Sequence, residues 1–160
     1  MKKISVWTIV ALLLVILLMG TTLAAASGRK PLPLKGSIEA VETYQVNGPS
    51  MFVTATGTGE ATHLGRYTVS YEVEVDLPTG SGTGLSAQYV AANGDTLFAE
   101  GSGQATPTDD PTVFVVVETF TITGGTGRLD GATGNFTEER RVNIVTGVTS
   151  GTISGTIVLP

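Results

Sequence analysis

One stretch of the 160-residue chain decides its fold class: Tyr67-Thr68-Val69-Ser70-Tyr71-Glu72-Val73-Glu74-Val75-Asp76. Its odd-numbered positions hold tyrosine and valine, and its even-numbered positions hold polar or acidic residues. Successive side chains of a β-strand point to opposite faces, so this alternation predicts a strand with one dry face and one wet face. The period of two excludes an amphipathic helix here.

Seven more segments favour strands, because they are rich in threonine and valine and none carries an apolar stripe at helical spacing. The eight predicted strands span 36–44, 51–61, 67–76, 85–92, 95–104, 113–123, 135–145 and 151–159. Loops rich in glycine and proline connect them. Asn93-Gly94 predicts a tight hairpin with a type I′ turn, since both central residues of that turn need positive φ.

Eight antiparallel strands with short connections favour closure into a barrel, because closure removes exposed edges. The predicted fold is therefore an all-β, calycin-like, eight-stranded antiparallel barrel. A two-sheet β-sandwich is the alternative, because strand periodicity does not separate the two architectures.

The first 26 residues have the pattern of a signal peptide. Lys2 and Lys3 precede an apolar run at 10–19, and Ala24 and Ala26 satisfy the small-residue cleavage rule. We expect cleavage after Ala26, a linker at 27–33 and a barrel domain at 34–160, in a secreted or periplasmic protein. An uncleaved N-terminal helix that anchors the protein is the alternative, and it would be the one contact with a membrane.

Composition excludes several classes of function. Removing 1–26 takes away two of nine basic residues and none of the fourteen acidic ones, which leaves a net charge of −7 and argues against nucleic acid as a partner. The chain has no cysteine and one histidine, so it lacks the ligands for a Cys/His zinc site. We predict no metal and no cofactor, although a carboxylate-rich calcium site stays open.

A glycine-rich segment at 123–136 lies between two predicted strands. It contains Gly124, Gly125, Gly127, Gly131 and Gly134. It lacks the Gly-Lys-Ser/Thr ending of a Walker A loop, and its glycine spacing does not fit a dinucleotide fingerprint. We interpret it as a shaped corner between strands, with a ligand-binding loop as the alternative.

The string GGTGRLDGATGNF at 124–136 resembles the late glycine-rich segment of allene oxide cyclase-like and dirigent-like barrels. ATHLGRY at 61–67 and GTISGTI at 151–157 look like secreted bacterial relatives of the same barrel. The resemblance implies an eight-stranded antiparallel barrel that often forms dimers or trimers, so a homo-oligomer is an expectation here. Some members guide the cyclisation or coupling of small apolar molecules inside the barrel. Their catalytic residues find no match in this chain, so the resemblance carries over the fold and not an activity.

Alternation places charged residues on apolar faces. Glu138 and Arg140 share a face with Phe136, and Glu118 shares one with Phe114 and Phe120. If these faces point inward, the charges meet inside the barrel, where ionisable groups are candidates for function. The alternatives are a bulge that turns them to solvent, or a structural ion pair.

His63 and Arg66 lie between two predicted strands. His63 is a candidate base or ligand contact because its ordinary pKa lies near neutrality, and Arg66 follows three residues later. An exposed turn is the alternative.

Three functions follow for the expected barrel. The first is an exported protein that binds a small apolar or amphipathic molecule in the barrel interior, with Phe114, Phe120 and Phe136 among its contacts. The second is a cyclase or coupling guide that acts through Glu118, Glu138 and Arg140. The third is a non-catalytic cell-surface or matrix protein with a filled barrel. A cavity of about 300 Å³ or more lined by those charges separates the first two from the third.

Overall fold

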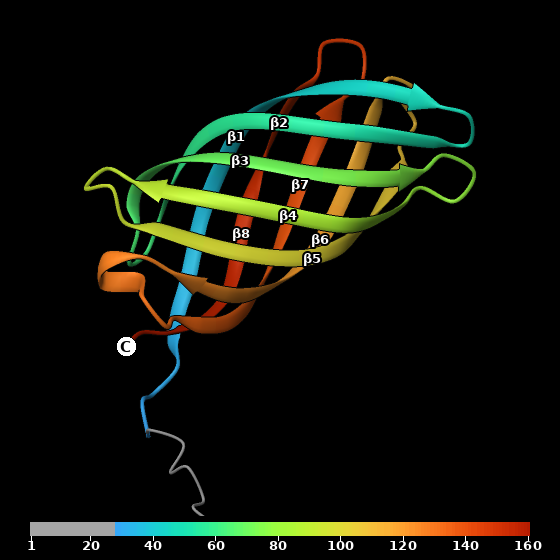
Figure 1. The fold of residues 1–160 in the computed structure, drawn as a ribbon. Helices are drawn as coiled ribbons and strands as arrows, with labels where there is room; N and C mark the ends of the chain where they lie inside the picture. The colour runs from blue at the N-terminus through green and yellow to red at the C-terminus, as the bar shows by residue number, and fades with distance from the viewer. Residues whose placement is uncertain (1–27) are drawn as a thin grey trace, which may run out of the picture.

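The computed structural model describes residues 28–160 and shows a closed barrel of eight antiparallel strands (Figure 1). The elements are β1 (Leu32–Asn47), β2 (Ser50–Ala61), β3 (Gly65–Asp76), β4 (Ser81–Ala91), β5 (Thr96–Pro107), β6 (Val113–Gly125), the 3-10 helix η1 (Gly127–Leu129), β7 (Thr133–Asn143) and β8 (Val148–Val158). Every predicted strand overlaps one of these. The barrel is confirmed over the sandwich, while the predicted signal peptide at 1–26 lies outside the described residues.

Strand β1 closes the barrel. Its residues 36–47 pair with β2 and its residues 32–41 pair with β8, so the middle of the strand is bonded on both sides. Where β1 pairs with both neighbours, closure leaves no exposed strand edge with which another chain could pair. The strand also begins at Leu32, which pairs with Ile157, so it includes the last two residues of the segment predicted as a linker.

The Asn93-Gly94 hairpin forms, but its turn is not type I′. Among the described residues other than glycine, only His63 has positive φ, so Asn93 does not meet the type I′ requirement. Gly94 has φ of 89°, and its N–H donates to the Ala91 carbonyl. This matches a three-residue loop in which a left-handed glycine follows the turn. The dipeptide predicted the hairpin correctly and the turn type wrongly.

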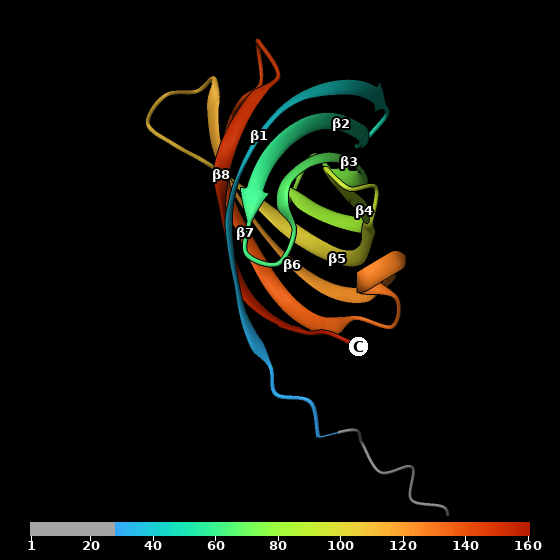
Figure 2. The same ribbon diagram turned by 90° about the vertical axis from the view of Figure 1, so that its left-hand side faces the viewer.

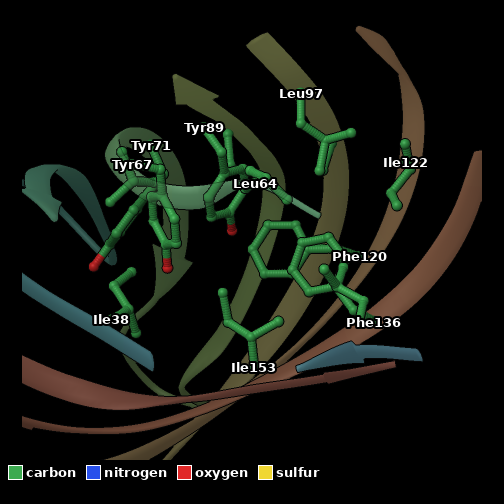
Figure 3. Packing of buried hydrophobic residues seen from close by; sticks show 14 of the residues in the cluster. Ile38, Leu64, Tyr67, Tyr71, Tyr89, Leu97, Phe120, Ile122, Phe136 and Ile153 are labelled. Atoms are coloured by element: carbon green, nitrogen blue, oxygen red, sulfur yellow. The ribbon is translucent and has the colours of Figure 1, made fainter. Parts of the chain in front are cut away.

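One end of the barrel is packed solid, and we call it the sealed end (Figure 3). Phe120 and Phe136 stack with ring centroids 4.7 Å apart, and Tyr89 meets Phe136 edge to face at 5.8 Å. Leu64 from the β2–β3 loop and Leu129 from η1 are buried against the same cluster. Aromatic pairs of this kind stabilise a core beyond their buried area.

The opposite end, which we call the mouth, is framed by the β1–β2, β3–β4, β5–β6 and β7–β8 loops. The β5–β6 and β7–β8 loops extend at the top of Figure 2, while the C-terminus and η1 lie toward the bottom. The first and last strands start and finish at the sealed end, where Leu32 pairs with Ile157. Residues 28–160 include no helix long and apolar enough to cross a membrane.

Candidate functional site

A cavity of about 350 Å³ opens at the mouth of the barrel. Its walls are mostly aliphatic and aromatic side chains, and they include Tyr44, Val46, Met51, Val53, Val73, Val75, Leu77, Phe114, Val116, Val142 and Ile144. Glu42, Glu118 and Arg140 line the same cavity and are themselves buried, so they form its floor. Its volume lies at the lower end of the range for small-molecule pockets, about 300–1,000 Å³.

Arg140 is the centre of the floor. Its Nε and Nη2 atoms donate to the two carboxylate oxygens of Glu118 at 3.0 and 2.9 Å, and its Nη1 donates to Glu42 and to Thr149. Burial alone would lower the pKa of Arg140, but the ion pairs with Glu118 and Glu42 outweigh burial and hold that pKa well above its usual value. Arg140 therefore stays charged.

Glu42 belongs to the candidate site but was not predicted from the sequence. It lies on β1, accepts hydrogen bonds from the hydroxyls of Tyr71 and Tyr44 at 2.8 Å each, and pairs with Arg140. Burial raises the pKa of both tyrosines above its ordinary value, so both remain donors. The alternation rule that we applied to 113–123 and 135–145 also places Glu42 on the inward face of 36–44, with Ile38 and Ala40.

Glu138 lies behind the floor, between Arg140 and the aromatic core. Its side chain is 1% exposed, its Oε1 lies 3.5 Å from Arg140 Nε, and its Oε2 accepts a hydrogen bond from Tyr89 at 3.4 Å. Burial, and next the neighbouring Glu118, raise the pKa of Glu138 to about 8. The protonated form of Glu138 is therefore favoured up to a higher pH than in an exposed glutamate. We call Glu42, Glu118, Glu138 and Arg140 the charge cluster.

Strand register explains how four large polar side chains fit inside the barrel. Glycines occupy inward positions directly across from two of them: Gly103 pairs with Glu118, and Gly151 pairs with Arg140. A Cβ added at Gly103 or at Gly151 would approach the facing side chain to about 2.5 Å, closer than real contacts allow. These glycines provide the room that the charge cluster occupies.

Each buried polar atom of the charge cluster has at least one hydrogen-bond partner within the protein. Among residues 28–160, no buried side-chain nitrogen or oxygen lacks a partner, and no group of acidic or histidine side chains is placed to hold a metal ion. Glu118, Glu138 and Arg140 point inward, which is one of the orientations that the sequence left open, and they form the ion-paired arrangement that was given as an alternative. The floor therefore offers fixed charges and hydrogen-bonding atoms at the base of an apolar cavity.

The predicted aromatic contacts divide between the two ends of the barrel. Phe114 lines the cavity. Phe120 and Phe136 are buried in the stacked core of the sealed end and do not line it. Alternation finds inward-facing aromatic residues, but it does not say at which depth in the barrel they lie.

His63 and Arg66 lie outside the barrel. His63 is exposed in the β2–β3 loop with φ of 70°, and its Nε2 is 3.2 Å from the Pro33 carbonyl oxygen. Arg66 is exposed beside an open outer groove of about 670 Å³ over β1 to β4. This groove is larger than the cavity, but it contains none of the charge cluster, so we place the candidate site at the mouth.

The glycine-rich segment forms the corner that joins β6, η1 and β7 at the sealed end. Gly124, Gly127, Gly131 and Gly134 have positive φ, and Arg128 of this corner pairs with Asp95 across the surface at 2.8 Å. None of its residues lines the mouth cavity.

Comparison of the chain with family models, with curated proteins and with solved structures finds no match in any of the three.

Proposed function

We propose that this chain is an exported small barrel protein that binds a small apolar or amphipathic molecule in the mouth cavity. The observation that carries the proposal is the cavity itself, about 350 Å³ with mostly apolar walls above a polar floor. A barrel of eight strands is wide enough either to be filled by side chains or to hold one small ligand. Here side chains fill the sealed end, and the mouth has room for a ligand.

The placement of the carboxyl groups favours binding over turnover. Glu138 is the buried acid whose protonated state would suit proton transfer, yet it does not line the cavity. Glu118, which does, has both oxygens bound by Arg140. A general acid must reach within hydrogen-bond distance of the atom it protonates, so these positions support a binding site more than a cyclase. The resemblance to allene oxide cyclase-like and dirigent-like barrels stays a prediction.

The test is binding of a neutral apolar fluorophore, N-phenyl-1-naphthylamine, to the barrel domain. We expect saturable binding with increased emission, because the probe leaves water for the apolar cavity. In the variant Ala105→Trp, an indole at a cavity-lining position of β5 narrows the mouth and weakens binding about tenfold or more, a loss of about 1.4 kcal/mol.

The matched control is Thr106→Trp, because Thr106 is the next residue on β5 and is exposed. This variant should bind the probe within about twofold of the unmodified protein. Circular dichroism verifies that both variants fold. Equal binding by the two folded variants, or no binding by the unmodified domain, would overturn the proposal.

A further inference from the structure

The floor of the cavity has more hydrogen-bond acceptors than donors. A guanidinium has five N–H groups, and a carboxylate accepts at about four lone-pair sites. Arg140 makes four hydrogen bonds, Glu118 accepts two and Glu42 accepts three. About three acceptor sites on the two carboxylates therefore remain unused, while Arg140 has one unused N–H group.

The charge balance of the floor also favours a ligand that donates hydrogen bonds. The carboxylate of Glu118 neutralises the positive charge of Arg140, and Glu42 adds a second carboxyl group at the floor. An anionic head group placed here would meet these two carboxyl groups, and Arg140 has one N–H left to offer it. A head group that donates hydrogen bonds and carries positive charge meets complementary partners.

The loops around the mouth also favour a cation. Asp76 ends β3 at the mouth, the β5–β6 connection holds Asp109 and Asp110, and the four mouth loops of the described chain contain no lysine or arginine. A concave site rimmed by one sign of charge concentrates oppositely charged ligands. Leu77, which is exposed and lines the cavity, directly follows Asp76 and suits the tail of an amphipathic ligand.

We propose that the ligand of the mouth cavity is a small amphipathic cation of the apolar amine class, an inference that rests on the proposed function. Its ammonium enters first and donates its three N–H groups to Glu42 and Glu118, and its hydrocarbon part packs against Val53, Val73 and Val116. An ammonium in an apolar cavity is stable only when carboxylates replace its lost water, and this floor supplies them.

The test compares three ligands that share one hydrocarbon chain: octylamine, 1-octanol and octanoate. Each competes with N-phenyl-1-naphthylamine for the barrel domain at neutral pH. We expect octylamine to bind about tenfold more tightly than octanol, and octanoate to bind more weakly than octanol. Octylamine binding should weaken between about 0.02 and 0.5 M salt, while octanol binding should not weaken.

The variant Glu42→Gln removes one floor carboxylate and should reduce the preference for octylamine over octanol to about twofold or less. Glu39→Gln, an exposed change on the same strand, is the control and should keep the preference. If Glu42→Gln does not fold, the ligand series and its salt dependence on the unmodified protein decide the question alone.

The outcomes separate this inference from the proposed function. If the fluorophore binds but octanoate competes as well as octylamine, or if folded Glu42→Gln keeps the amine preference, the ligand is not a cation and the binding function stands. If the fluorophore does not bind the unmodified domain, both proposals fail.

Discussion

Arg140 and Glu118 meet side-on inside the barrel, with two parallel N–H···O bonds of 3.0 and 2.9 Å, and each side chain is 3% exposed. Two-bond pairing of this kind fixes the guanidinium in one plane. The other hydrogen bonds of Arg140, to Glu42 and Thr149, then follow from that orientation. The geometry of the cavity floor thus depends on this one pair.

Arg140→Met should lower the free energy of unfolding by about 3–5 kcal/mol, because it leaves buried carboxylates without their counter-charge. Urea denaturation followed by circular dichroism measures the change. Arg141→Met is the neighbouring control: Arg141 is exposed, and its replacement should change stability by no more than about 0.5 kcal/mol. Equal effects of the two replacements would contradict a central role for Arg140.

Stability should depend on pH through Glu138. Because its folded pKa of about 8 exceeds the ordinary 4.5, the folded state binds the proton more tightly than the unfolded state. The contribution of Glu138 to the free energy of unfolding is therefore complete below about pH 4.5 and is lost as pH rises to about 8. The free energy of unfolding falls by at most about 1.4 kcal/mol per pH unit in this range.

Glu138→Gln tests this linkage, because a neutral amide has no proton to lose. Relative to the unmodified protein, the variant should gain stability steadily between about pH 4.5 and 8 in a series of urea titrations. Glu139→Gln alters the exposed neighbour and should leave the pH profile unchanged. Parallel stability curves for Glu138→Gln and the unmodified protein would show that Glu138 titrates normally.

Gly103→Ala should destabilise the barrel by about 1–3 kcal/mol, because the added methyl group overlaps the Glu118 side chain across β5 and β6. Thermal unfolding measures the effect. Ser102→Ala, an exposed change on the adjacent residue, should be close to neutral. A neutral Gly103→Ala would show that Glu118 has room to move.

Tyr71→Phe and Tyr44→Phe each remove one donor from Glu42, but the two tyrosines differ in burial. Loss of the buried Tyr71 hydroxyl should cost about 1–3 kcal/mol, since no water can replace it. The half-buried Tyr44 lines the open cavity, so solvent can replace its hydroxyl and the cost should be smaller. Chemical denaturation of both variants should show a larger loss of stability for Tyr71→Phe than for Tyr44→Phe. A larger loss for Tyr44→Phe would contradict this account.

The predicted export is tested by the mass of protein recovered outside the cells of an exporting host. Cleavage after Ala26 gives a chain that starts at Ser27. Replacing Ala24 and Ala26 together by leucine should block cleavage and leave the full-length chain with the membrane fraction. Full-length chain in the medium would argue against a signal peptide.

Most of the fold could be predicted because one rule, alternation, applies along most of the barrel wall and is interrupted at bulges such as the one between Gly82 and Leu85 in β4. Tyr67 to Asp76 alternates without interruption, and β3 appears there as expected. The same rule put Glu118, Glu138 and Arg140 on the apolar faces of their strands, and these residues lie inside the barrel because β6 and β7 pair without a register shift from Val113 to Ile122. Alternation is reliable where no bulge intervenes.

Alternation does not say how deep in the barrel an inward side chain lies, or which side chains of other strands it contacts. Phe114 and Phe120 share a face of β6, yet the first lines the cavity and the second belongs to the sealed end. Register between strands decides this, and residues far apart in sequence set it. Glu42 lies 98 positions from Arg140, so their contact follows from closure of β1 against both neighbours.

Both ends of the described chain leave the barrel at the end opposite the mouth (Figure 1). A tether at either terminus, whether a fused domain, an affinity tag or a bead, therefore holds the protein with its opening directed away from the attachment. Immobilised protein should take up small molecules as freely as protein in solution. On any surface to which a terminus attached the barrel, the mouth would likewise face away from that surface.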